Sequence, residues 1–172
     1  MELVVKEYLK QPEIIDFYKK MVAFSFEDNK IDDKKAKVEE LNDKVAKLQS
    51  FRNGEGKLLL FYNKNKLVAT ISYSKPNDLL RITSKQPKLC DYELGTVFID
   101  PSMQGRGFLS QMIMRIKEEL IKQNIEEVCF DCGYQNAQQV WIHKYGQADE
   151  VFNDFWGEGS IYMIWYIEVE KL

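Results

Sequence analysis

The residues best suited to chemistry form a short turn between an apolar strand and an amphipathic helix. The turn reads Gln104, Gly105, Arg106 and Gly107. At the start of a helix the backbone N–H groups have no partner within the helix, and the helix dipole adds positive potential. The two glycines let the main chain approach a ligand without a Cβ in the way. The pattern predicts a phosphate site, and a generic strand-to-helix turn is the alternative.

The cysteines offer a second pattern, because Cys129 and Cys132 form a CxxC motif. In a strand, alternate side chains point to opposite faces, so these two thiols cannot share one ligand. Zinc needs about four ligands, which the motif alone does not supply. An odd number of cysteines, three in all, fits a reducing compartment. We therefore expect no metal site.

Composition narrows the class of protein. A chain of 172 residues, 45% hydrophobic, suits one globular domain spanning residues 1–172. A net charge of -3 disfavours a nucleic-acid partner, which requires clustered Lys and Arg. No apolar run approaches the ~18 residues that cross a bilayer, and the first residues lack a signal-peptide pattern. We expect a cytoplasmic protein with no membrane partner.

Hydrophobic periodicity predicts the elements that position the turn. Strands are expected at residues 2–9, 57–64, 66–74, 90–99 and 127–134, with two more between residues 150 and 170. Helices are expected at residues 12–26, 31–48, 109–122 and 137–145. The polar segment 76–87 is expected to be an irregular loop that covers a site. The order of these elements indicates an α/β protein with a mixed sheet and helices on both faces, because the third helix must cross over between parallel strands.

The expected helix at residues 31–48 carries a narrow apolar stripe. Ile31, Val38, Leu41, Val45 and Leu48 recur at spacings of seven, three and four. The stripe predicts packing on the domain's own sheet. A coiled-coil seam gives the same spacing, so a dimer interface is the alternative.

This order of elements, with the glycine turn after the fourth strand, resembles that of the GNAT family, the GCN5-related N-acetyltransferases. The family signature has the form Q/R-x-x-G-x-G/A, which residues 104–107 match. Phe108 follows, and Leu109 replaces the final small residue. The resemblance covers nearly the whole chain. It implies a mostly antiparallel sheet of about seven strands, splayed between strands four and five and flanked by about four helices.

The resemblance also implies a site for acetyl-coenzyme A. The expected pantetheine contacts are backbone groups of Val97, Phe98 and Ile99. The expected pyrophosphate contacts are the N–H groups of Gly105, Arg106, Gly107, Phe108, Leu109 and Ser110. Asn136 lies where the family often has an asparagine that contacts coenzyme A, and capping of the following helix is its alternative role. The spacing of Leu109 with Met112 and Ile113 predicts that its side chain turns into the core.

Acetyl transfer to an amine requires a base, an oxyanion donor and an acid for the departing thiolate. Glu93 is at the position of a general base in some family members, and Asp91 could assist. Backbone N–H groups of residues 97–99 could stabilise the oxyanion. His143 is at the position where many family members carry a tyrosine that acts as the general acid. If the register differs, Tyr145 would be the general acid instead. For each of these side chains a solvated, non-catalytic role is the alternative.

The sequence thus predicts an acetyl-CoA-dependent N-acetyltransferase that acts on an amine of a small molecule or protein. The amine attacks directly in a ternary complex, and no metal is used. The altered Leu109 and the missing catalytic tyrosine leave an alternative, a catalytically inactive module that binds coenzyme A or another protein. We expect a monomer or a homodimer, and the sequence does not identify the acceptor.

Overall fold

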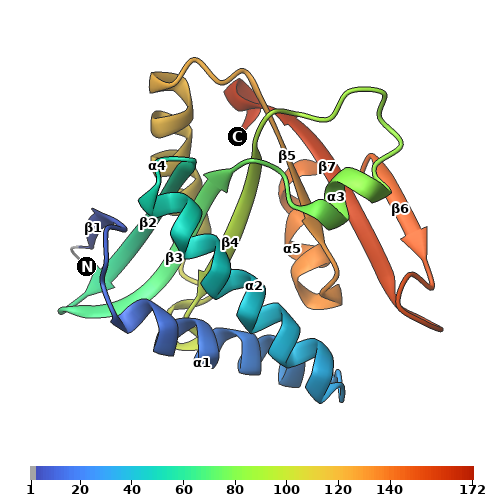
Figure 1. The fold of residues 1–172 in the computed structure, drawn as a ribbon, viewed down its shortest axis with the longest axis horizontal. Helices are drawn as coiled ribbons and strands as arrows, with labels where there is room; N and C mark the ends of the chain where they lie inside the picture. Colours follow the sequence, from blue (N-terminus) through green and yellow to red (C-terminus); the bar gives the residue numbers. More distant parts are fainter. Residues whose placement is uncertain (1–2) are drawn as a thin grey trace.

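The computed structural model describes residues 3–172. Glu2, the first residue of the expected first strand, lies outside the described residues. Within these residues a single sheet has the strand order β1-β2-β3-β4-β5-β7-β6 (Figure 1). The strands are β1 (Val4–Glu7), β2 (Gly56–Asn63), β3 (Lys66–Ser74), β4 (Glu93–Ile99), β5 (Glu127–Cys132), β6 (Glu150–Asn153) and β7 (Ile161–Glu168). All neighbouring pairs are antiparallel except β4 with β5, which is parallel. The predicted mixed, mostly antiparallel sheet is confirmed.

Helices cover both faces of the sheet, as predicted. They are α1 (Glu13–Asp28), α2 (Lys34–Arg52), α3 (Asp78–Thr83), α4 (Phe108–Lys122) and α5 (Gln135–Tyr145), with short 3-10 turns at Pro101–Met103 and Val169–Lys171. In Figure 1, α1 and α2 lie in front of the sheet, and α5 lies behind it. The core is divided in the same way, because α1 and α2 pack on one apolar cluster and α4 and α5 on another.

Helix α4 is placed by its strong apolar stripe. Met112, Ile113, Ile116 and Leu120 are fully or almost fully buried at spacings of three and four. Phe108 opens the helix and packs edge-on against Phe61 of β2, with ring centroids 5.8 Å apart. The first turn of the helix is therefore fixed to the sheet directly after the glycine turn.

Strands β4 and β5 part soon after they begin. Their ladder holds one residue pair, Glu93 with Cys129, next to a bond from the Cys129 N–H to the Tyr92 carbonyl. Beyond this pair the β4 edge has no ladder partner on β5. The splay that the resemblance implied between the fourth and fifth strands is confirmed.

Two expectations about local structure require correction. The segment 76–87 contains a helix, α3, because Asn77 caps it by accepting a hydrogen bond from the Leu80 N–H at 2.8 Å. In α2, Leu48 is buried but Val38 is 58% exposed. The stripe of residues 31–48 therefore packs on the sheet only toward its C-terminal end.

The two thiols of the CxxC motif lie in different clusters, as strand alternation requires. Cys129 packs beside Leu80 and Cys90, whereas Cys132 belongs to the α4 and α5 side of the core. Within residues 3–172, no helix is long and apolar enough to cross a membrane.

Candidate active site

The glycine turn lies beyond the C-terminal end of β4, on the side where β4 and β5 have parted. Gly105 and Gly107 have φ values of +71° and +69°, a left-handed conformation that glycine adopts without strain. A Cβ added to either would meet no atom within 4 Å. Residues 104–107 are exposed, and Gly107 is the N-cap of α4. The turn thus presents free backbone N–H groups beside open space, as an anion site requires.

Side chains around the turn divide between surface and core. Arg106 and Ser110 are exposed, while Phe108 is buried and Leu109 is half-buried against the core. The core contact of Leu109 agrees with its predicted orientation. The Gln104 side-chain amide donates to the Ile99 carbonyl at 3.2 Å, which ties the turn to the end of β4.

Strand β4 contains a bulge where it has left β5. Against β3, Thr70 pairs with Phe98 and Ser72 pairs with Gly95, so β4 uses one more residue than β3 between these pairs. Thr96 sits in the bulge with φ +46° and is buried. Its hydroxyl donates to the Ser72 Oγ, and its carbonyl accepts from the Thr70 hydroxyl, both at 2.7 Å. These bonds hold a strained backbone directly before Val97.

Glu93 is a buried carboxylate at the first residue of β4, with a relative exposure of 2%. One oxygen pairs with the Lys47 ammonium of α2. The other oxygen accepts from the Asn77 N–H and from the Asn77 side-chain amide, each at 2.9 Å. Burial raises the pKa of Glu93, and the Lys47 ammonium opposes this shift without cancelling it. A base with a raised pKa can take up a proton nearer neutral pH.

Further ionisable groups surround Glu93 on the same face of the sheet. Asp131 of β5 accepts a hydrogen bond from the Tyr162 hydroxyl at 2.6 Å. Lys44 pairs with Glu40 at 3.1 Å on α2. Burial lowers the pKa of Lys44, but the nearby carboxylates outweigh it and raise the pKa overall. This is a polar patch that the sequence did not reveal.

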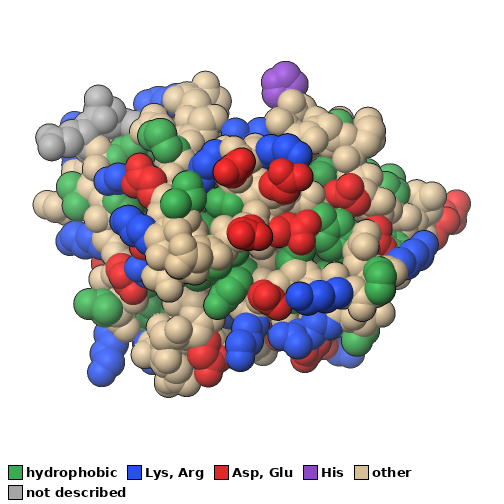
Figure 2. Space-filling model, turned by 90° about the horizontal axis from the view of Figure 1, so that it is seen from above, with side chains coloured by type: hydrophobic (Ala, Val, Ile, Leu, Met, Phe, Trp, Pro, Cys, Tyr) green, Lys and Arg blue, Asp and Glu red, His purple; other side chains and the backbone are tan. Residues whose placement is uncertain are grey.

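The other predicted base and the two predicted acids have contrasting surroundings. Asp91 is exposed and lies before β4 begins. His143 is exposed, and Figure 2 shows the single histidine standing clear of the surface. The Tyr145 hydroxyl is buried without a hydrogen-bond partner among the described residues. Its ring stacks on Trp141 at 6.0 Å and lies 5.9 Å from Phe130 of β5. Burial raises the pKa of Tyr145, so its hydroxyl stays protonated.

Asn136 connects α5 to the end of α1. Its side-chain amide donates to the Asp28 carboxylate at 2.7 Å and to the Asp28 carbonyl at 3.1 Å. Its N–H donates to the Asn29 side chain at 3.1 Å. The N-cap of α5 is Tyr134, so Asn136 does not cap the helix. In this arrangement its amide N–H donors hold the turn between α1 and α2 rather than a ligand.

Sequence reasoning missed Lys47 and Asn77, the two partners of Glu93. Lys47 belongs to a lysine-rich helix, and nothing in its spacing separates it from solvated neighbours. Asn77 carried a weak signal, because Asn followed by Asp and an apolar pair is typical of a helix N-cap.

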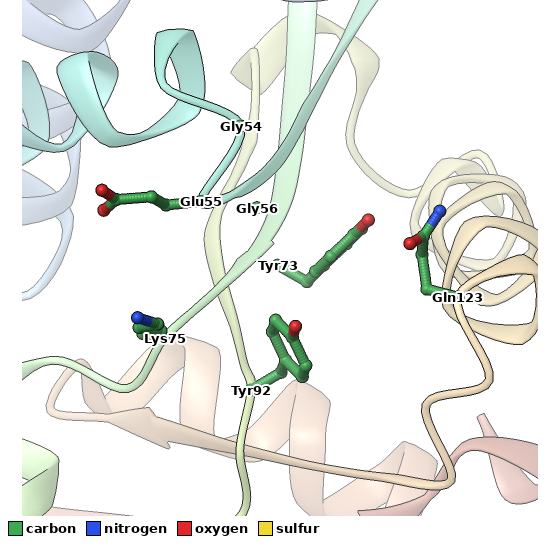
Figure 3. A pocket seen from close by; sticks show the side chains of 7 residues that line it. All are labelled: Gly54, Glu55, Gly56, Tyr73, Lys75, Tyr92 and Gln123. Atoms are coloured by element: carbon green, nitrogen blue, oxygen red, sulfur yellow. The ribbon is translucent and has the colours of Figure 1, made fainter.

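A separate hollow of about 280 Å³ lies between the start of β2 and the start of β4 (Figure 3). The rings of Tyr73 and Tyr92 face it, and their centroids are 5.7 Å apart. Tyr92 precedes β4 and packs against the apolar cluster of α4 and α5, whereas Glu93 contacts Lys47 of α2. The hollow is therefore distinct from the surroundings of Glu93.

The model of the acetyltransferase (GNAT) family matches residues 15–146. The chain belongs to the GNAT family of acetyltransferases. At the level of individual curated proteins, no sequence matches the chain.

Solved structures show the same fold at low sequence identity. An N-acetyltransferase from Staphylococcus aureus Mu50 has a TM-score of 0.69 at 10% identity, covering 98% of this chain and 99% of that one. PaiA N-acetyltransferase from Thermoplasma acidophilum, in complex with coenzyme A, has a TM-score of 0.65 at 10% identity, covering 97% and 100%. YncA from Salmonella typhimurium, with its cofactor acetyl-CoA, has a TM-score of 0.66 at 12% identity, covering 98% and 95%.

Proposed function

We propose that the protein is an N-acetyltransferase that moves an acetyl group from acetyl-CoA to an amine. The observation that carries this proposal is the position of the glycine turn beyond the parted ends of β4 and β5. Ligands of sheets with parallel strands bind outside the carboxyl ends of those strands. The β4 edge beyond Glu93 has no ladder partner on β5, so backbone groups of Val97, Phe98 and Ile99 would pair with the pantetheine amides, and N–H groups of the turn would hold the pyrophosphate.

The binding role of the turn belongs to main-chain groups. N–H groups from Gly105 to Ser110 would hold the pyrophosphate, with charge from Arg106 in support. Phe108 and Leu109 contribute only their backbone, because their side chains pack on the core. Asn136 would reach the cofactor only by releasing Asp28.

The proposed reaction gives a role to Glu93, to the backbone after the Thr96 bulge and to the two candidate acids. The neutral amine attacks the thioester carbonyl carbon, forming the C–N bond. Backbone N–H groups after the Thr96 bulge stabilise the oxyanion, and collapse of the intermediate breaks the C–S bond. Glu93 takes the proton of the amine, directly or through water, because a lysine-like amine with a pKa of ~10.4 is protonated near pH 7. The thiolate receives a proton from Tyr145 or His143. Tyr145 is favoured because its hydroxyl stays protonated and has no hydrogen-bond partner among the described residues.

The test mixes the protein with acetyl-CoA and a panel of monoamines, diamines, amino acids and peptides. Amine-dependent release of coenzyme A, with an acetylated product identified by mass spectrometry, supports the proposal. Tight binding of acetyl-CoA by calorimetry with no amine-dependent release would replace the enzyme by a coenzyme A-binding module. Absence of both would overturn the cofactor site as well.

A further inference from the structure

We infer that Lys47 is a positioning residue. Together with Asn77 it holds Glu93 ionised and oriented toward the side of the β4–β5 gap from which the amine acceptor would approach. This inference rests on the proposed acetyl transfer. It concerns a helix residue that contacts Glu93 rather than the reacting atoms.

The contacts around Glu93 join three elements at one carboxylate. Lys47 reaches it from α2, with only 20% of its side chain exposed, and Asn77 reaches it from the segment before α3. Asn77 is itself fixed, since its side-chain oxygen accepts from the Leu80 N–H. A side chain held by three donors from two separate elements has little freedom to change rotamer. Lys47 and Asn77 therefore set where the Glu93 oxygens point.

The Glu93 carboxylate keeps one acceptor position for a substrate. An ionised carboxylate offers about four acceptor positions, and the three donors of Lys47 and Asn77 use all but one. Gly95, two residues on, has no side chain to fill the space beside Glu93. A Cβ there would stand 3.5 Å from the nearer Glu93 oxygen and 3.7 Å from the Lys47 ammonium. The remaining acceptor position can thus meet an amine or a water without loss of the Lys47 pair.

The charges facing Glu93 show why Lys47 is needed. On β5, Asp131 repels the ionised form of Glu93, and the Lys47 ammonium opposes that repulsion. The Glu93 charge in turn acts on Lys44 of α2, on Cys129 of β5 and on Tyr162 of β7. Lys44 carries its own partner, Glu40. Among residues 3–172, Lys47 is the cation in direct contact with Glu93, so its removal leaves a buried carboxylate beside Asp131 without that counter-ion.

The experiment measures the Glu93 carboxyl directly. Protein labelled with 13C at the glutamate carboxyl is titrated by NMR, and Glu93→Gln assigns the signal. Lys47→Met should raise the titration midpoint of Glu93 by about one pH unit or more, because an adjacent cation stabilises the charged form. Lys47→Arg should restore it in large part. Lys57→Met, which breaks a pair with Glu119 elsewhere, is the matched control and should leave it unchanged.

Turnover provides the second readout. In Lys47→Met, the acidic limb of the kcat/KM profile should move to higher pH by the same amount, with the affinity for acetyl-CoA unchanged. If Lys47→Met does not fold, Lys47→Gln, which keeps a donor but not the charge, is expected to give the same shift. An unshifted Glu93 titration in the folded variants overturns the role of Lys47. The titration needs no turnover, so failure of the proposed acetyl transfer would be recognised separately.

Discussion

The Glu93 carboxylate accepts two hydrogen bonds from Asn77, one from the backbone N–H and one from the side-chain amide, each at 2.9 Å. Together with the Lys47 pair, these bonds fix a buried acid at the point where β4 and β5 part. Burying a charged carboxylate is costly unless it is paired and hydrogen-bonded. The ammonium of Lys47 and the two N–H donors of Asn77 compensate this cost for Glu93.

Replacing Glu93 by Gln should lower kcat/KM by roughly 100-fold or more, the usual contribution of a general base. In the unaltered protein kcat/KM should fall as the pH drops through the Glu93 pKa, which burial raises above its ordinary value. The acidic limb should disappear in the variant. Steady-state kinetics across pH measures both effects. Asp91→Asn, which alters an exposed carboxylate two residues away, is the control, and an unchanged pH profile in Glu93→Gln would remove Glu93 from the mechanism.

Replacing Gly107 by Ala should weaken coenzyme A binding. A side chain at φ +69° is strained by roughly 1 kcal/mol, and its Cβ would enter the open space beside the turn. Gly54→Ala is matched in conformation, with φ +77° and no atom within 4 Å of an added Cβ, but lies outside the proposed site. Both variants should lose similar stability, and only Gly107→Ala should lose affinity in calorimetry. Equal coenzyme A affinities would argue against a pyrophosphate site at the turn.

Asp100 should stabilise the fold above about pH 4 and lose this contribution on acidification. Burial alone would raise the pKa of this carboxyl, but hydrogen bonds from Lys20 and Ser102 lower it to about 2. Because the folded pKa lies below the ordinary value of ~3.9, the stabilisation is lost as the pH falls toward 2. Asp100→Asn should cost roughly 1–3 kcal/mol at pH 7 and less at pH 3, as measured by urea unfolding.

The control for Asp100 is Asp16→Asn, whose carboxylate is largely exposed in its pair with Lys19. It should change the free energy of unfolding by well under ~1 kcal/mol. Equal losses for both variants, or a loss in Asp100→Asn that does not depend on pH, would refute the assignment.

Tyr145→Phe should slow turnover more than His143→Phe. This ranking reverses the expectation from residue spacing, because the structure leaves the Tyr145 hydroxyl buried and unpartnered within the described chain while His143 is exposed. Removing an unpartnered buried hydroxyl should not lower thermal stability. Kinetics combined with thermal melting would separate the two effects. A slower His143→Phe enzyme would restore the histidine as the acid.

The native protein should react slowly with thiol reagents. Cys90, Cys129 and Cys132 are buried, and burial raises the pKa of Cys132 to about 12. Thiolates are the reactive form, so labelling should be slow until denaturant is added. Stopped-flow measurement with and without denaturant tests this. Rapid native labelling of one equivalent would show that a cysteine is accessible.

The proposed cofactor half of the site could be read from the sequence because its signals are local. A glycine turn, the end of the apolar strand before it and a helix with five buried residues on one face all lie within residues 97–120. The same applies to the element order and to the separation of Cys129 from Cys132, which follow from strand and helix periodicity. These features predicted the fold, and the splay followed from the family resemblance.

The catalytic half could not be read in this way. The pair of Lys47 with Glu93 spans 46 positions, and the bond of Asn136 to Asp28 spans 108. The sequence around the lysines of α2 does not distinguish one from another. Only the packing of the helix on the sheet brings Lys47 into contact with Glu93. The spacing of His143 and Tyr145 likewise did not predict which of the two side chains is buried.

The sequence by itself therefore determined the strands, the helices other than α3, the glycine turn and the family, because these depend on periodicity and on the conformational freedom of neighbouring residues. Only the tertiary structure decided which ammonium meets Glu93, that the Tyr145 hydroxyl is buried, and that the Asn136 amide is already bonded. Those contacts join residues far apart in the chain. They form only when the hydrophobic faces of separate elements are packed against one sheet.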